Sequence, residues 1–236
     1  MSGNRLKPSS IGSSIGTRKE SSLHKSLKLH CAGSEGSYET LVEGFVCDGR
    51  AKTGELIEVQ CGSFAPLAKK VKALTEKHKM RIIHPIIAKK YIELYDTEGN
   101  FVRGKTSPKK GSEWDLFKAL LYAPHLPLLK NLTIELAIVE VLEVRVNDGS
   151  GSWRRGGVSI TDRRLTSWKS SVLLRGAKDY RRFIPFEKGE LFTVKDLSVK
   201  AGIHKSLAGK SIYTLFKMGH LNKACKKANA IVYAHV

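Results

Sequence analysis

The sequence lacks the long apolar runs and the closely paired cysteines that mark several classes of protein. No run approaches the ~20 apolar residues that a membrane-spanning helix needs, and the first residues contain no apolar signal core. The four cysteines form no C-x-x-C pair, so we expect neither a zinc site nor a disulfide framework. Together these absences predict a reduced cytoplasmic protein that has no membrane partner.

Acidic residues are scarce relative to basic ones. The chain has 41 Lys and Arg against 22 Asp and Glu, which gives a net charge of +19. A membrane surface could attract such a chain, but its basic residues are spread along the sequence rather than gathered on one amphipathic helix. We therefore expect a nucleic-acid partner and association with the nucleoid. The length of 236 residues suits one large domain, or one large and one small domain.

Two acidic residues lie on short strand-like segments that a predicted turn over residues 49–54 separates. The first segment ends at Asp48, and the second carries Glu58 and Gln60 on one face, because strand side chains alternate. If the segments pair as a hairpin, the two carboxylates lie side by side and need a positive partner. Mg²⁺ suits such oxygen ligands, and a site of this kind can hydrolyse phosphodiesters. A solvated hairpin with ordinary charges is the alternative.

The spacing of Asp48 and the run Glu58-Val59-Gln60 resembles the PD-(D/E)XK nuclease superfamily, which includes restriction endonucleases, Holliday-junction resolvases and transposon endonucleases. The resemblance implies an α-β-β-β-α-β core with Mg²⁺, or Mn²⁺, held by Asp48 and Glu58. It also implies that Gln60 occupies the position where the family usually has Lys. Lys69 or Lys70, in the next predicted helix, could then supply the missing positive charge.

Residues 18–32 predict a one-sided helix, because two leucines lie four residues apart. Members of the superfamily often carry a Glu on this helix that faces the metal, so Glu20 is a third candidate carboxylate. His24 lies one turn later on the same side. The alternative is that Glu20 only interacts with the helix dipole and that His24 is a surface residue. Residues 1–17 read as a disordered basic arm.

The middle of the chain predicts further helices and strands that complete a core over residues 18–146. The acidic residues of its last strand are expected on the solvent side. The predicted helices are 64–79 and 112–123, the predicted strands are 81–87, 90–95 and 132–146, and the acidic residues are Glu135, Glu140 and Glu143.

Two basic loops are candidates for contacts with DNA. The loop 103–111 is basic and has no apolar side chain between its strand and helix, a composition that often grips phosphates. A Gly-rich loop within the predicted connector 147–190 places Trp153 beside two arginines, which suits backbone gripping or base stacking. The alternative for loop 103–111 is an unstructured excursion without a role in binding. The alternative for the Gly-rich loop is that Trp153 is a hydrophobic plug for the end of a hairpin. The candidate residues are Lys109, Lys110, Arg154 and Arg155.

Residues 191–236 predict a helix, a tight turn, a second helix and two strands, which is the winged helix-turn-helix pattern. Thr193 is the expected cap of the first helix. The segment has eight lysines and one acidic residue, a net charge of +7. That charge favours DNA, although winged helices also serve as protein-docking modules. The candidate DNA contacts are Lys205, Ser206, Lys210, Lys226 and Lys227.

We therefore expect an α/β protein with a restriction-endonuclease-like core and β extension, a basic connector and a C-terminal winged helix. Taken whole, the chain resembles a bacterial type with this two-part build. The predicted function is a metal-dependent endonuclease that acts on double-stranded DNA. A non-catalytic DNA-binding protein with a degenerate core is the alternative. An RNA-binding or ribosome-associated protein would explain the charge but not the paired acids. A homodimer is one option for the assembly.

Overall fold

The fold is mixed α/β and is built around one large sheet. The computed structural model describes residues 21–32 and 37–236. Seven strands form the sheet in the order β1-β2-β3-β4-β6-β7, and β5 pairs with β4. The strands are β1 (Ser37–Val42), β2 (Phe45–Arg50), β3 (Leu56–Val59), β4 (Met80–Tyr95), β5 (Phe101–Thr106), β6 (Leu132–Val146) and β7 (Ser159–Leu174).

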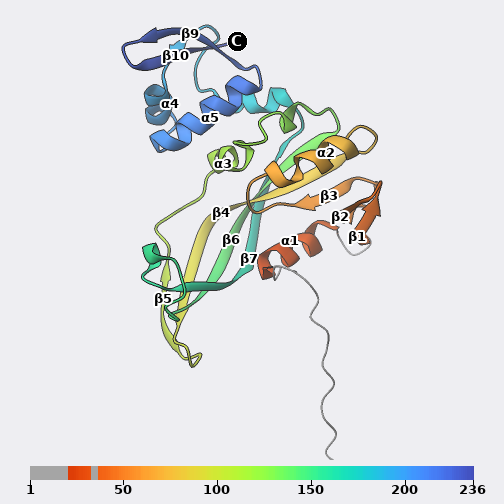
Figure 1. Ribbon diagram of the computed structural model, residues 1–236, viewed down its shortest axis with the longest axis vertical. Coiled ribbons are helices and arrows are strands. Elements are labelled where there is room, and N and C mark those ends of the chain that lie inside the picture. Colours follow the sequence, from red (N-terminus) through yellow and green to blue (C-terminus); the bar gives the residue numbers. More distant parts are fainter. Residues whose placement is uncertain (1–20, 33–36) are drawn as a thin grey trace, which may run out of the picture.

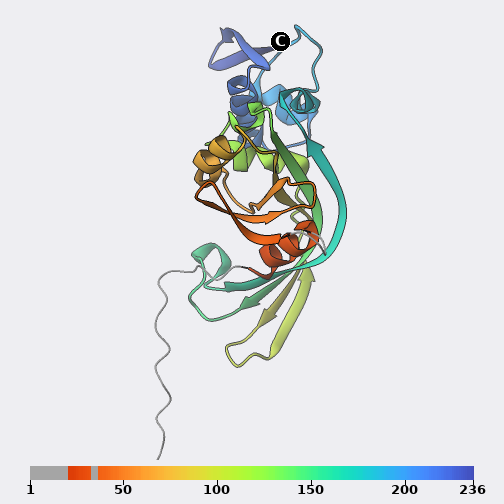
Figure 2. The same ribbon diagram turned by 90° about the vertical axis from the view of Figure 1, so that its right-hand side faces the viewer.

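Helices cover the two faces of the first part of this sheet (Figure 2). Three helices belong to it: α1 (Ser22–Ala32), α2 (Ala68–Leu74) and α3 (Leu116–Leu120). Leu27 of α1 packs in one cluster with Ile57, whereas Val71 of α2 packs in another cluster with Leu56. Because neighbouring strand residues point to opposite faces, α1 and α2 lie on opposite sides of β3. Strands β1 to β3 are antiparallel, and β4 runs parallel to β3.

Three long strands carry the sheet well beyond the helices. β4, β6 and β7 run along the molecule, and β5 pairs with the second half of β4 (Figure 1). The sequence predicted two strands where β4 is continuous, with only a register shift between Ile87 and Lys89. Pro85 is tolerated there because β3 ends at Val59, opposite Ile83, so no neighbour on that side needs its missing amide hydrogen.

The strand β6 has the predicted bounds, but two of its acidic side chains are buried rather than solvated. Glu135 is 5% exposed and Glu143 is 0% exposed. Glu135 lies against Arg81 of β4, and Glu143 lies against Lys90 of β4 and Arg163 of β7. The prediction that these carboxylates face solvent was wrong. Strand alternation alone does not show that side chains from neighbouring strands cover them.

The predicted basic connector over residues 147–190 is in large part a strand. β7 pairs with β6 from Ser159↔Val146 to Leu174↔Ile134. Its side chains are mostly half-buried or exposed, so the strand lacks the apolar alternation that sequence reasoning uses to recognise one. A 3-10 helix, Ala177–Phe183, follows it.

The C-terminal segment contains two helices followed by two strands, in the predicted order. Its elements are β8 (Leu191–Phe192), α4 (Val194–Lys200), α5 (Lys205–Lys217), β9 (Leu221–Lys227) and β10 (Ala230–His235). Thr193 caps α4 by accepting a hydrogen bond from the amide of Asp196. The strands form a small sheet in the order β8-β10-β9. None of the helices in the described part of the chain is long and apolar enough to span a membrane.

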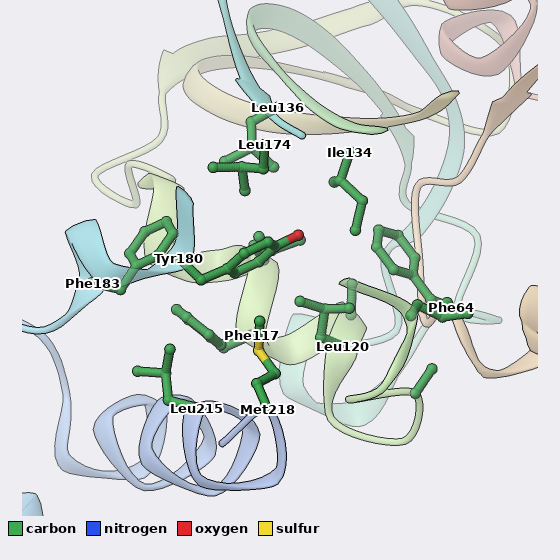
Figure 3. Close-up of a cluster of buried hydrophobic side chains, with 14 of the residues drawn as sticks. Phe64, Phe117, Leu120, Ile134, Leu136, Leu174, Tyr180, Phe183, Leu215 and Met218 are labelled. Carbon is green, nitrogen blue, oxygen red and sulfur yellow. The ribbon is translucent and has the colours of Figure 1, made fainter. Parts of the chain in front are cut away.

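The C-terminal segment shares its core with the rest of the molecule. Leu215 and Met218, from α5 and its end, point toward Phe117 of α3 and Tyr180 (Figure 3). All four residues belong to one buried cluster, which crosses the predicted boundary at residue 190. The apolar packing therefore holds the C-terminal segment against the end of the large sheet.

Candidate active site

The two motif carboxylates lie on neighbouring strands. β2 and β3 pair antiparallel with Gly49↔Ile57 and Arg50↔Leu56. Asp48 and Glu58 are the next residues of the two strands beyond the last paired residues. The turn is shorter than the predicted 49–54, because Gly49 and Arg50 already belong to β2.

Asp48 is held by three donors. Its Oδ2 accepts a hydrogen bond of 2.8 Å from the amide of Val59 and lies 3.3 Å from Nε2 of His24. Its Oδ1 lies 2.8 Å from Nζ of Lys28. Burial by itself raises the pKa of Asp48, but the bonds with His24, Lys28 and the amide outweigh it and lower the pKa to about 2. The hydrogen bond with Asp48 in turn raises the pKa of His24 to about 9.

Within the described part of the chain, the cationic partner of Glu58 is Lys70, which comes from the next helix. Nζ of Lys70, on α2, lies 2.5 Å from Oε2 of Glu58 and also donates to the carbonyl of Val46. Glu58 is 7% exposed. Its burial, together with the nearby charge of Asp48, raises the pKa of Glu58 even though Lys70 lowers it. The charge of Asp48 therefore acts on Glu58, and the negative charge of Glu58 is less well compensated than that of Asp48.

The cations reach the carboxylates from opposite faces of the sheet, since Lys28 belongs to α1 and Lys70 to α2.

Gln60 forms no side-chain hydrogen bond with these carboxylates in the described chain. Its side-chain amide donates a hydrogen bond of 2.6 Å to the backbone carbonyl of Ser63, and the backbone carbonyl of Gln60 accepts one from Nδ1 of His84. Gln60 thus helps to fix the loop after β3, while Lys70 is the side chain that contacts Glu58.

The other predicted catalytic residues are not brought to this pair. Lys69 is exposed and makes no ion pair within the described chain. Glu20 lies outside the described residues. Within residues 21–32 and 37–236 there is no group of three or more His, Cys, Asp or Glu side chains that could hold a metal. A cation shared by Asp48 and Glu58 stays a prediction.

The predicted DNA contacts Lys109 and Lys110 line a large cleft. This cleft has a volume of about 820 Å³ and runs from the loop after β3 to the start of α5. Both lysines are exposed. Lysines from β4, the loop and α3 line the cleft, together with a histidine before α5. The residues concerned are Lys90, Lys109, Lys110, Lys118 and His204. An acidic residue, Asp115, also lines the cleft and pairs with Lys118.

The remaining predicted DNA contacts fall at the two ends of the molecule (Figure 1). Arg154 and Arg155 line a cavity of about 240 Å³ at the far end of the long strands. The C-terminal candidates lie at the opposite end, on α5 and on β9. Of these, Lys205, Ser206, Lys226 and Lys227 are exposed and Lys210 is half-buried.

Sequence reasoning missed two features of these sites. Lys28 was not considered, although it lies four residues after His24 and therefore on the same helical face. Arg103, Lys105 and Arg145 were not linked to the loop arginines, because only the pairing of distant strands brings them together.

Comparison with known proteins places the chain in a family. A protein of Treponema pallidum (strain Nichols), described as uncharacterized, is 25% identical over 191 residues, which are 80% of this chain and 76% of that protein. No solved structure matches the chain. The model of a domain of unknown function, DUF8091, matches residues 21–175, a span that holds both motif carboxylates and the whole large sheet. The chain therefore belongs to the DUF8091 family.

Proposed function

We propose that this protein is a metal-dependent DNA endonuclease of the PD-(D/E)XK type. The order α1-β1-β2-β3-α2-β4, with β4 parallel to β3, supports the proposal, because it is the order that the resemblance implies. A winged helix at the C-terminus agrees with two helices followed by a hairpin. Fold alone does not assign a function, so the proposal depends on the site.

The single observation that carries the proposal is the contact between Lys70 and Glu58. The motif has Gln60 where a lysine is usual, and the side chain of Gln60 is committed to Ser63. Lys70 reaches the motif glutamate from the following helix instead. Only 14% of this lysine side chain is exposed, so its charge is held beside the carboxylate rather than in solvent.

The donor set suits a hard divalent cation. Mg²⁺ commonly binds through one or two carboxylates together with phosphate oxygens of the substrate. Asp48 and Glu58 offer two carboxylates on neighbouring strands, and the raised pKa of Glu58 reflects burial and repulsion that a cation would relieve. Asp48 and Glu58 would hold Mg²⁺ or Mn²⁺, which when bound would neutralise phosphate charge and make a water more acidic.

The protein's own side chains have separate tasks in this proposal. Lys70 would hold positive charge beside Glu58, where negative charge builds up on a phosphodiester under attack. Lys28 and His24 would keep Asp48 ionised, since its pKa is already about 2. The lysines of the cleft, of α5 and of β9 would bind phosphates of duplex DNA and supply most of the affinity.

A non-catalytic DNA-binding protein is the second candidate, and one observation favours it. Each motif carboxylate already has a lysine of the same chain within 2.8 Å. In such a protein, these ion pairs would close an old active site and leave the core as a scaffold for the basic surfaces.

Nicking of a supercoiled plasmid by the full chain separates the two functions. We expect nicking in Mg²⁺ or Mn²⁺, and we expect Asp48→Ala to lower its rate by roughly three decades, because a whole metal ligand is lost. Affinity for duplex DNA in Ca²⁺ should change little, since phosphate contacts elsewhere provide it.

Glu76→Ala is the matched control, because it removes an exposed acid from the end of the same helical region that carries Lys70. It should nick like the wild type. If the wild type cleaves no DNA in either metal but binds duplex, the second candidate replaces the first.

A further inference from the structure

The ends of β4 and β6 and the strand β5 lie away from the C-terminal segment in both views (Figures 1 and 2). A basic pocket lies at this end of the long strands. We call this end of the sheet, residues 89–106 and 140–165, the arm. The pocket has a volume of about 240 Å³. Cations of β5, β6 and the loop before β7 line it over an apolar floor from β4 and Val158. The cations are Arg103, Lys105, Arg145, Arg154 and Arg155.

Most of the charge of this arm pocket is not compensated within the described residues, and Arg145 is the exception. No acidic residue lines it. Arg103 and Lys105 are exposed and form no ion pair within the described chain. Arg145 is fixed by Glu143, whose Oε1 lies 2.8 Å from its Nε. Several guanidinium groups around a small cavity are the arrangement that binds a phosphate group.

An exposed aromatic ring stands beside the arm pocket. Trp153 is 83% exposed. The guanidinium carbon of Arg154, which lines the pocket, lies 5.4 Å from the centre of the Trp153 ring. The ring is therefore one side chain away from the arm pocket. Because it is exposed, it does not plug the hairpin end, which was the alternative from the sequence.

The loop that carries Trp153 is closed upon itself. The amide of Gly151 donates a hydrogen bond of 2.6 Å to the carbonyl of Gly157. A Cβ at Gly151 would lie 1.9 Å from the carbonyl oxygen of Val158, so only glycine fits. Gly156 and Gly157 adopt positive φ angles of 63° and 82°. These features fix the backbone of the loop from which Trp153 projects.

We infer that the arm pocket and Trp153 bind a nucleotide of single-stranded DNA, with its phosphate in the pocket and its base stacked on the indole. The stacking needs a base with a free face, and bases within a duplex have none. The inference rests on the proposed function and names its substrate class: DNA that has an unpaired stretch next to a duplex. The duplex would lie on the cleft and the C-terminal segment, and the unpaired strand on the arm.

Binding of a fluorescein-labelled oligothymidylate to the full chain tests the inference. Trp153→Ala should weaken binding roughly tenfold, and Trp153→Phe should restore most of it, because a phenyl ring also stacks. Tyr122→Ala is the control, since it removes another exposed ring, 75% accessible, from outside the arm. It should bind like the wild type.

Two further measurements show where the single-stranded DNA binds. Bound oligothymidylate should quench tryptophan emission, and Trp153→Phe should remove most of that quenching although Trp114 and Trp168 remain. The pair Arg103→Ala and Lys105→Ala should lower the slope of log affinity against log salt by about one or more, since each phosphate contact releases counterions. The pair Lys72→Ala and Lys79→Ala, two exposed lysines outside the arm, is the charge-matched control.

Equal affinity of wild type and Trp153→Ala for oligothymidylate would overturn the inference, as would a failure of Trp153→Phe to restore binding. Failure of the proposed function looks different. If the wild type nicks no plasmid but Trp153→Ala weakens oligothymidylate binding, the arm site stands and the nuclease proposal fails. If the wild type nicks plasmid but Trp153→Ala does not change oligothymidylate binding, the nuclease proposal stands and the arm site fails.

Discussion

Glu58 and Glu143 are both buried glutamates in the same sheet, yet their environments shift their pKa in opposite directions. Glu143 is 0% exposed and has Lys90, Arg145 and Arg163 around it. Burial raises its pKa, but these three cations outweigh burial and lower the pKa to about 2. Glu58 is 7% exposed, has one lysine, and keeps a raised pKa.

The difference separates a structural carboxylate from one that is available for binding. At Glu143 the cations exceed what the charge requires, so the ionised form is firmly stabilised and the network ties β4, β6 and β7 together. At Glu58 the charge is under-compensated beside a second carboxylate, a condition typical of functional sites. The comparison therefore predicts that Glu58 serves a ligand and that Glu143 serves the sheet.

The most direct test of this comparison is to remove Lys70, the lysine that contacts Glu58. If Lys70 supplies the positive charge of the active site, Lys70→Met should slow plasmid nicking by about two decades, because electrostatic stabilisation of the reacting phosphate is lost. Lys69→Met, the exposed neighbour on the same helix, is the control and should nick normally. Equal rates for both variants would show that Lys70 only neutralises Glu58.

The structural role of Glu143 is tested by stability. Glu143→Gln should lower the free energy of unfolding by about 2 kcal/mol, because three cations lose a buried partner. This is below the cost of breaking a fully buried pair, since Arg163 is 42% exposed and can turn to water. Urea denaturation gives the value. Nicking by the folded variant should persist, and its loss would place Glu143 in the site.

Acid unfolding gives a second measure of the same network. The pKa of Glu143 is about 2 in the folded chain against an ordinary value of 4.5, so the unfolded chain binds more protons between these values. The stabilisation is complete above pH 4.5 and is lost as the pH falls toward about 2. Wild type should therefore approach the stability of Glu143→Gln on acidification, with the gap closing by roughly 1 to 2 kcal/mol. A constant gap would contradict the ionised network.

The smallest effect is expected at Glu58. Its raised pKa means that folding makes ionisation of Glu58 less favourable than in the unfolded chain. Glu58→Gln removes this charge and should therefore change the free energy of unfolding by less than about 1 kcal/mol. The same urea titration measures it beside Glu143→Gln. A loss as large as that of Glu143→Gln would mean that Glu58 is a structural residue too.

Local sequence patterns were sufficient for several elements and for one feature of the site. The bounds of β6, the cap at Thr193 and the C-terminal order of two helices and two strands follow from periodicity and capping, which depend only on neighbouring residues. That Asp48 and Glu58 lie on neighbouring antiparallel strands follows from two short strand-like segments separated by a turn.

Other features depended on contacts between distant segments. β4 is continuous through Pro85 because β3 has already ended beside it. The polar β7 is a strand because β6 offers a ladder of backbone partners along its whole length, and backbone hydrogen bonding carries no sequence pattern of its own. Glu143 is buried because cations from β4 and β7 cover it.

The sequence by itself therefore determined the local elements and the pair of acids, since these depend on residues close along the chain. Only the tertiary structure decided which cation serves which acid and where the basic surfaces gather. Lys28 and Lys70 reach Asp48 and Glu58 from opposite faces of the sheet, and β5, β6 and the Trp153 loop together form the arm pocket. Long-range packing sets these electrostatic partners, because a charge responds to what is near it in space, whatever its position in the chain.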